Sequence, residues 1–345
     1  MLKHTHTEPA SVNFLKLEER ILGVNNSQNG KYEKMCRMIC DIVSDGKPTL
    51  IMATGGSKVV AYYLQSILGF KGLGVTPTLV IEPRSFFYLR DIQSYGNLVV
   101  ISNSGKTNGV MAALEKFKGN KYLICQNENN IDNCKVIAWG TDDYTSEKSF
   151  ISLASTLAPM SLILDVCKNG IQQPISPDVI TNVNSIISNF IKDSNESINC
   201  LSFDFKNIDK IQIISGRDTK TPEHALESTV LESGLCVPTV SDKGSFCHGR
   251  NNIIFRYPEM PIIYLKSNET KLDSTILGLL YEEYPNVFVF GDKLLNFDEY
   301  EKEYLLTIQM YFLAKKIADD KNLDLTMPEY NPKLVRTLYN YKGEM

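Results

Sequence analysis

The chain has 345 residues, 43% of them apolar, and a formal net charge of −4 at pH 7. This length and composition are typical of a globular protein with room for two packed units. Basic residues form no long stripe, which argues against nucleic acid or a membrane surface as a partner. No apolar run approaches the length of a membrane span, and the first residues lack the apolar core of a signal peptide. We therefore expect a cytoplasmic protein.

Cysteine and histidine spacing predicts neither disulfides nor a metal. The eight cysteines are widely spread, and several lie in apolar segments, as buried reduced thiols do. Cys36 and Cys40 are one helical turn apart but have no nearby histidine or cysteine to complete a zinc site. We expect no metal and no cofactor.

The first half of the chain reads as helices followed by alternating strands and helices. Residues 1–46 have helical apolar faces and are expected to form an N-terminal helical cap. Between 47 and 170 the alternation predicts a parallel sheet with helices on both faces. The expected strands are 50–53, 78–82, 98–102 and 122–125, and 151–168 is expected to be a mostly apolar helix. A polar connecting segment follows at 171–206.

Two hydroxyl-bearing turns follow strands of this first half and open into helices. Such turns offer side-chain hydroxyls and free backbone N–H groups at a positive helix end, which suits a phosphate. Ligands of open α/β sheets collect at the carboxyl ends of strands, so both turns could serve one anion pocket. Neither the Walker A spacing nor Gly-x-Gly-x-x-Gly occurs, which favours a small phosphate ester over ATP or NAD. Serine and glycine also punctuate ordinary turns. The candidate residues are Thr54, Gly56, Ser57, Ser102, Asn103, Ser104 and Thr107.

The second half, 207–300, repeats the plan, and 301–345 is expected to be a helix and tail that close the active site. Strands are predicted at 211–215, 261–266 and 286–291. A helix start is predicted at Thr221-Pro222-Glu223, with a capping hydroxyl, a proline at the first position and an acid in the first turn. The turn 266–270 takes the place of the Ser102 turn but lacks its Ser-Gly pair. We therefore predict an internal duplication with one intact and one degenerate phosphate cradle.

Three residues of the second half and the tail could carry acid–base chemistry. Glu232 ends the helix 225–232, and a carboxylate at the negative end of a helix dipole binds a proton more readily, which suits a general base. His248 lies in a turn beside a glycine, where it could transfer a proton near neutral pH. Lys333 follows two prolines in the tail. Taken singly, a solvated glutamate, a core histidine and a surface lysine are the ordinary interpretations.

Together these motifs resemble the proteins built from a pair of sugar isomerase (SIS) domains, similar to the isomerase half of glucosamine-6-phosphate synthase and to the fructosamine-6-phosphate deglycases. The resemblance spans residues 47–336. It rests on the order of five features: Gly-x-Ser at 55–57, Ser-x-Ser-Gly-x-Thr at 102–107, Ala-Ser-Thr at 154–156, the spacing of Glu232 from His248, and Pro328 with Lys333.

The resemblance implies an α/β fold of two tandem SIS domains, each a parallel sheet flanked by helices in a flavodoxin-like three-layer sandwich. It also implies isomerisation, deamination or deglycation of a 6-phosphosugar or aminosugar phosphate. Glu232 would move a proton between carbons 1 and 2, His248 would open the ring and Lys333 would lie near the developing charge. The two turns would hold the phosphate, with Ser155 and Arg250 also in the pocket. A homodimer with an active site shared between subunits is implied as well.

Departures from the family pattern leave the substrate open. Leu157 stands where the family often has lysine, and Arg250 follows His-Gly where proline is common. No glutaminase domain is present in the sequence, so glutamine-dependent synthesis is not expected. Two alternatives remain: a non-catalytic phosphosugar-binding sensor, and an enzyme for a larger phosphorylated ligand such as a nucleotide-linked sugar. In the second alternative Arg250 or Arg217 would meet the extra negative charge.

Overall fold

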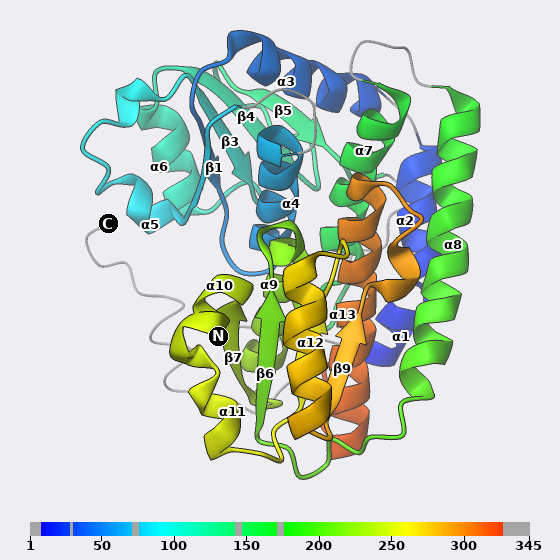
Figure 1. The fold of residues 1–345 in the computed structure, drawn as a ribbon. Coiled ribbons are helices and arrows are strands. Elements are labelled where there is room, and N and C mark those ends of the chain that lie inside the picture. Colours follow the sequence, from blue (N-terminus) through cyan, green and yellow to red (C-terminus); the bar gives the residue numbers. More distant parts are fainter. Residues whose placement is uncertain (1–7, 28–29, 71–75, 142–146, 171–175, 327–345) are drawn as a thin grey trace, which may run out of the picture. The chain divides into compact units, whose positions relative to one another are not determined.

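The computed structural model describes residues 8–27, 30–70, 76–141, 147–170 and 176–326 (Figure 1). The chain divides into two compact units between Ser188 and Asn189, inside helix α8 (Pro177–Asn199). Each unit is described by itself. Helix α8 lies in the segment 171–206, which was predicted to be a polar connection. The helix forms there because Val183, Ile187 and Phe190 recur at helical spacing and are buried.

The first unit is built on a five-stranded, wholly parallel sheet with the strand order β2-β1-β3-β4-β5. This is the flavodoxin-like order, in which the strand sequence reverses direction between β1 and β3. The predicted strands are confirmed with small shifts at their ends, whereas β5 was not predicted. The strands are β1 (Thr49–Met52), β2 (Thr78–Ile81), β3 (Asn97–Ile101), β4 (Asn120–Cys125) and β5 (Lys135–Ala138).

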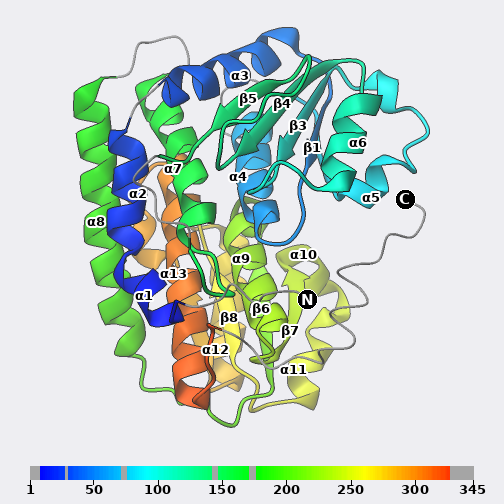
Figure 2. The same ribbon diagram turned by 180° about the vertical axis from the view of Figure 1, so that it is seen from behind.

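Helices cover both faces of this sheet, as the continuous apolar strands require. In both views α4 and α6 lie on opposite sides of it (Figure 1, Figure 2). Leu98 and Val100 of β3 pack with Leu114 of α6 in one apolar cluster. Helices α2 and α3 contact α7. The helices are α1 (Ala10–Leu15), α2 (Leu17–Asn26), α3 (Lys31–Asp45), α4 (Ser57–Phe70), α5 (Pro83–Phe86), η1 (Ile92–Ser94), α6 (Asn108–Lys116) and α7 (Ala154–Asn169).

The second unit repeats this plan on a four-stranded parallel sheet of order β7-β6-β8-β9. Its order equals that of the first four strands of the other sheet, which agrees with the predicted duplication. The strands are β6 (Lys210–Ser215), β7 (Val237–Asp242), β8 (Ile262–Leu265) and β9 (Val287–Phe290). Strand β7 was not predicted.

One face of the second sheet packs under α11 and α12, where Ile214, Ile262 and Tyr264 join an apolar cluster. Helix α9 contacts β6 and β7 and packs against α13. The remaining elements are η2 (Arg217–Thr219), α9 (Lys220–Glu232), α10 (Lys243–Ser245), η3 (Phe246–Arg250), α11 (Asn252–Arg256), α12 (Lys271–Glu283), η4 (Asp292–Leu294) and α13 (Glu299–Lys321).

The predicted start of the second-unit helix was wrong in its details. Helix α9 begins at Lys220, directly after the short turn η2. The backbone N–H of Gly216 donates to the Thr219 hydroxyl at 2.8 Å. The hydroxyl of Thr221, which was expected to cap the helix, instead donates to Glu303 of α13. A tertiary partner thus replaced the local cap. No helix in the described part of the chain is long and apolar enough to span a membrane.

Candidate functional site

Both hydroxyl-bearing turns of the first unit lie at the carboxyl edge of its sheet. Strands β1 and β3 are paired neighbours, with Met52 opposite Val100. The turn at 54–57 leads from β1 into α4, and the turn at 102–107 leads from β3 into α6. Because the strand order reverses between β1 and β3, these turns flank the switch point where open α/β sheets bind ligands. The prediction that the turns follow neighbouring strands is confirmed.

The turn after β3 is held in shape by its own serines and by the end of β4. The backbone N–H of Gly105 donates to the Ser102 hydroxyl at 3.2 Å, and that of Lys106 donates to the Ser104 hydroxyl at 3.3 Å. The N–H of Ser102 donates to the carbonyl of Ile124 at 3.0 Å. Both hydroxyls accept in these bonds, so each still has a proton to donate. Gly105 has a φ of +63°, a conformation that glycine adopts without steric cost.

The polar groups of this edge are accessible. Asn103, Ser104 and Thr107 are exposed, and Ser102 is half-buried. Thr107 is the N-cap of α6, but its side chain makes no capping hydrogen bond. The first N–H groups of α6 therefore point out of the helix end without a side-chain cap, beside three hydroxyls. This combination of fixed donors and a positive helix end can bind an anion.

The turn after β1 is equally polar and touches the start of α7. Thr54 and Gly56 are exposed, and Ser57, the first residue of α4, is half-buried. A Cβ atom on Gly56 would lie 3.6 Å from the Thr156 hydroxyl oxygen, so α7 begins next to this turn. Ser155, also predicted to line the pocket, is half-buried in the first turn of α7. The first unit thus gathers three segments of predicted site residues.

Two charged residues near this edge were missed by the sequence analysis. Lys58 forms an ion pair with Glu82, which directly follows β2. Glu147 caps the start of α7: its carboxylate accepts from the N–H groups of Leu153, Ala154 and Ser155 at 2.9, 2.9 and 3.0 Å. The Glu147 side chain is 1% exposed, and an Arg20 nitrogen lies 3.9 Å away. Burial raises the pKa of Glu147, although the three N–H groups and Arg20 act in the opposite direction. No local pattern could reveal this cap, because it lies outside the helix it serves.

The corresponding edge of the second sheet is filled by carboxylates of the chain itself. Ser267, in the turn after β8, hydrogen-bonds to Asp218 in the turn after β6. Helix α12 has a complete capping box, in which Thr270 and Asp273 bind each other's backbone N–H groups at 3.1 Å. Lys243 forms an ion pair with Asp273 at 2.5 Å. Burial alone would raise the pKa of Asp273, but its bonds with Lys243, Thr270 and Tyr264 lower it. Carboxylates thus occupy the edge where the sequence predicts a degenerate cradle, which stays a prediction.

The predicted catalytic residues are spread over the second unit and beyond it. Glu232 is the exposed last residue of α9, in the connection that leads into the amino end of β7. His248 is exposed in η3, and the following Gly249 has a φ of +104°. Arg250 donates to the carbonyl of Val240 at 3.2 Å, which places this segment beside the carboxyl half of β7. The unit therefore does not bring Glu232 and His248 together. Lys333 and Pro328 lie outside the described residues.

Comparison with known proteins gives the fold a name. No protein-family model matches the sequence, and no curated protein matches it. Among solved structures, a protein described as a phosphosugar isomerase from Clostridium difficile 630 has a TM-score of 0.70 at 18% identity, with 97% of this chain and 99% of that one covered. The C-terminal domain of glucosamine-fructose-6-phosphate aminotransferase from Francisella tularensis has a TM-score of 0.67 at 16% identity, covering 94% and 98%. The chain folds as two tandem SIS domains.

A third similar structure is glucosamine-6-phosphate deaminase from Thermotoga maritima, with a TM-score of 0.66 at 14% identity and coverage of 92% and 98%. At these identities the likeness establishes the SIS fold and leaves the roles of individual residues as predictions. Within the described ranges, no three histidine, cysteine or carboxylate side chains are placed to hold a metal ion.

Proposed function

We propose that this protein is a phosphosugar-processing enzyme that isomerises, deaminates or deglycates a 6-phosphosugar or aminosugar phosphate. The observation that carries the proposal is the pair of hydroxyl-bearing turns at the β1/β3 switch point of the first SIS domain. There an uncapped helix end and the hydroxyls of Ser104 and Thr107 present donors to solvent. The activities by which two structural neighbours are named, a phosphosugar isomerase and a glucosamine-6-phosphate deaminase, support the same substrate class.

In this proposal the phosphate anchors the far end of the sugar and acid–base side chains act on its carbonyl end. Glu232 removes a proton from carbon 1 or 2 and returns it to the neighbouring carbon through an enediol or enolamine. His248 transfers the proton that opens the sugar ring, and Lys333 stabilises the developing negative charge. An amine on either carbon would then allow water to complete a deamination or deglycation.

The proposal includes a homodimer whose active site takes residues from both subunits. In the second SIS domain Glu232 precedes β7, whereas the His248 turn lies beside its carboxyl half. Strand residues rise about 3.3 Å each, so the two positions are separated along the strand. A second copy can supply the missing member of the pair. We therefore place Glu232 and His248 of one active site on different chains.

Binding of fructose 6-phosphate to a phosphate-loop variant tests the first part of this proposal. The double variant Ser104→Ala, Thr107→Val removes two donors, and each hydrogen bond to a charged group contributes about 1.5–3 kcal/mol. We expect its affinity for fructose 6-phosphate to fall by about a hundredfold or more in calorimetry, while unphosphorylated fructose binds neither protein measurably. Thr275→Ala is the control, because Thr275 is an exposed hydroxyl of α12 that bonds only within its helix. Equal affinities of the double variant and the wild type would contradict the assignment of the loop.

A further inference from the structure

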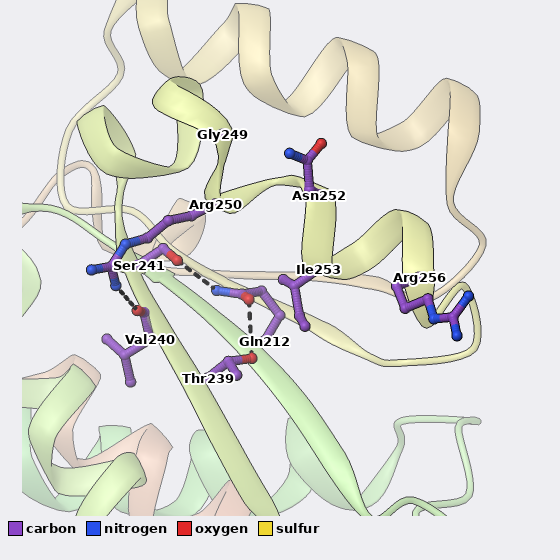
Figure 3. A pocket seen from close by; sticks show the side chains of 9 residues that line it. All are labelled: Gln212, Thr239, Val240, Ser241, Gly249, Arg250, Asn252, Ile253 and Arg256. Atoms are coloured by element: carbon purple, nitrogen blue, oxygen red, sulfur yellow. Dashed lines mark hydrogen bonds between the residues drawn. The ribbon is translucent and has the colours of Figure 1, made fainter.

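The second SIS domain carries a cavity that none of the residues of the two phosphate-binding turns line; one of its lining residues, Arg250, is also among those that the resemblance implies for the substrate pocket. The cavity volume is about 580 Å³, within the range of small-molecule sites. It lies between strands β6 and β7 and the segment 249–256, which includes α11 (Figure 3). Its lining residues are Gln212, Thr239, Val240, Ser241, Gly249, Arg250, Asn252, Ile253 and Arg256.

Polar residues form the floor of this cavity on a sheet face that is apolar elsewhere. Gln212 and Ile214 alternate with Ile213 along β6 and so share one face, where Ile214 joins the apolar cluster under α11 and α12. Gln212 is fully buried and opposite Thr239, and Ile214 is opposite Ser241. Polar side chains buried next to an apolar core lower the stability of the fold unless they form hydrogen bonds or bind a ligand.

The polar floor residues hydrogen-bond to one another in a way that leaves the Ser241 hydroxyl proton without an acceptor among them. The Thr239 hydroxyl lies 3.0 Å from both Gln212 Oε1 and the Ile211 carbonyl and donates to one of them, and Gln212 Nε2 donates to the Ser241 hydroxyl at 3.3 Å (Figure 3). Gln212 Nε2 also donates to the carbonyl of Ile213 at 2.9 Å. These bonds fix the amide and make Ser241 Oγ an acceptor, so the Ser241 proton remains available to a ligand.

The rim of the cavity is cationic. Arg250 and Arg256 lie on either side of the polar floor, and none of the described residues that line the cavity is an aspartate or glutamate (Figure 3). Arg250 uses one N–H on the Val240 carbonyl at 3.2 Å, which holds its guanidinium at the edge of β7 and leaves its other donors. Asn252 adds an exposed side-chain amide. Donors therefore outnumber acceptors here, as in sites that bind phosphate esters.

We propose that this cavity binds a second phosphorylated small molecule of sugar-phosphate size, with its phosphate on Arg250 and its hydroxyl groups on Ser241 and Asn252. This site is built from other residues than the phosphate loop of the first SIS domain, and its occupation does not depend on the proposed reaction. Gly249 and Arg250 directly follow His248. A ligand held by Arg250 would therefore also fix the backbone of the His248 turn, which makes the cavity a place where a phosphorylated effector can act on the enzyme.

Binding stoichiometry measured by calorimetry with glucose 6-phosphate tests this proposal. The double variant Arg250→Gln, Arg256→Gln removes the cationic rim, and Ser104→Ala, Thr107→Val disables the loop. Arg90→Gln is the matched control, because Arg90 is an exposed arginine outside the cavity. We expect two equivalents per chain for the wild type and the control, and one for each double variant. Combining all four substitutions should abolish binding.

Each other result has a definite meaning. A loop variant that binds no glucose 6-phosphate, or a rim variant that still binds two equivalents, would overturn the cavity site. If the rim variant binds no glucose 6-phosphate while the loop variant still binds it, the cavity site is supported. The phosphate loop then binds no sugar phosphate, and the proposed function loses its basis. Sedimentation of all variants gives their oligomeric state. If the rim variant keeps its binding stoichiometry but changes its oligomeric state, the cavity binds a second copy of this chain and not a ligand, which also overturns the proposal. Urea unfolding confirms that each variant is folded.

Discussion

The free energy of unfolding of the first SIS domain should decrease as the pH rises, because Asp165 of α7 is buried. Its side chain is fully buried, and neither carboxylate oxygen has a hydrogen-bond partner within the described part of the chain. Burial raises the pKa of Asp165 well above its ordinary value of 3.8. A folded-state pKa above the unfolded one means that the folded protein holds the proton more tightly. The stabilisation from protonated Asp165 is therefore complete below about pH 3.8 and is lost as the pH rises through the folded-state pKa.

The variant Asp165→Asn isolates this effect, because an amide of the same shape cannot ionise. Between the two pKa values the unfolding free energy of the wild type, relative to the variant, should fall by about 1.4 kcal/mol per pH unit. Urea titrations at several pH values between 5 and 8 measure this difference. Asp132→Asn, at an exposed loop position, controls for the loss of a carboxylate. A wild-type-minus-variant difference that stays constant with pH would refute the reasoning and indicate an ionised, paired Asp165.

Two further substitutions test the construction of the candidate site. Gly105→Ala should remove the equivalent of phosphosugar bound by the loop in calorimetry and cost about 1–3 kcal/mol in urea unfolding, since its Cβ would lie 2.7 Å from Asn129 Nδ2 at a φ of +63°. Gly278→Ala, in open space on α12, should instead add up to about 1 kcal/mol; equal effects would contradict the turn geometry. Glu147→Ala should cost about 2–4 kcal/mol, because it leaves three N–H groups without their acceptor, whereas Arg20 keeps its ion pair with Glu8; a loss below about 0.5 kcal/mol would show that the cap is dispensable.

The sequence predicted the elements whose signals are local and continuous. The central strands β1, β3, β6 and β8 are mostly apolar because helices cover both of their faces, and Gln212 is the polar exception inside β6. Strands β5 and β7 escaped prediction because their apolar signals are short or broken: β5 has four residues and begins with Lys135. In β7, Pro238 and three polar residues obscure the pattern, and an edge position tolerates the proline. Helix α8 escaped because asparagines and serines separate its buried apolar residues.

Some residues of the candidate site could be recognised from the sequence, and others required the structure. The turns at 54–57 and 102–107 could be recognised from sequence, because their serines, glycines and following helices lie within a few residues of one another. Glu147 and Asp218 could not, because each acts on a partner that only the fold brings near: the start of α7 and the turn after β8. The spacing of Glu232 from His248 was visible in the sequence, but their positions around β7 required the structure.

Incorporation of solvent deuterium tests the central claim most directly. Proton NMR in heavy water would follow fructose 6-phosphate, glucosamine 6-phosphate and a phosphorylated Amadori adduct with the wild type, Glu232→Gln and the exposed-site control Glu259→Gln. We predict that the wild type and the control introduce deuterium at carbon 1 or 2, or form product, with at least one of these substrates, and that Glu232→Gln does not. Binding of all three compounds without exchange by the wild type would contradict the enzyme assignment and favour a phosphosugar sensor.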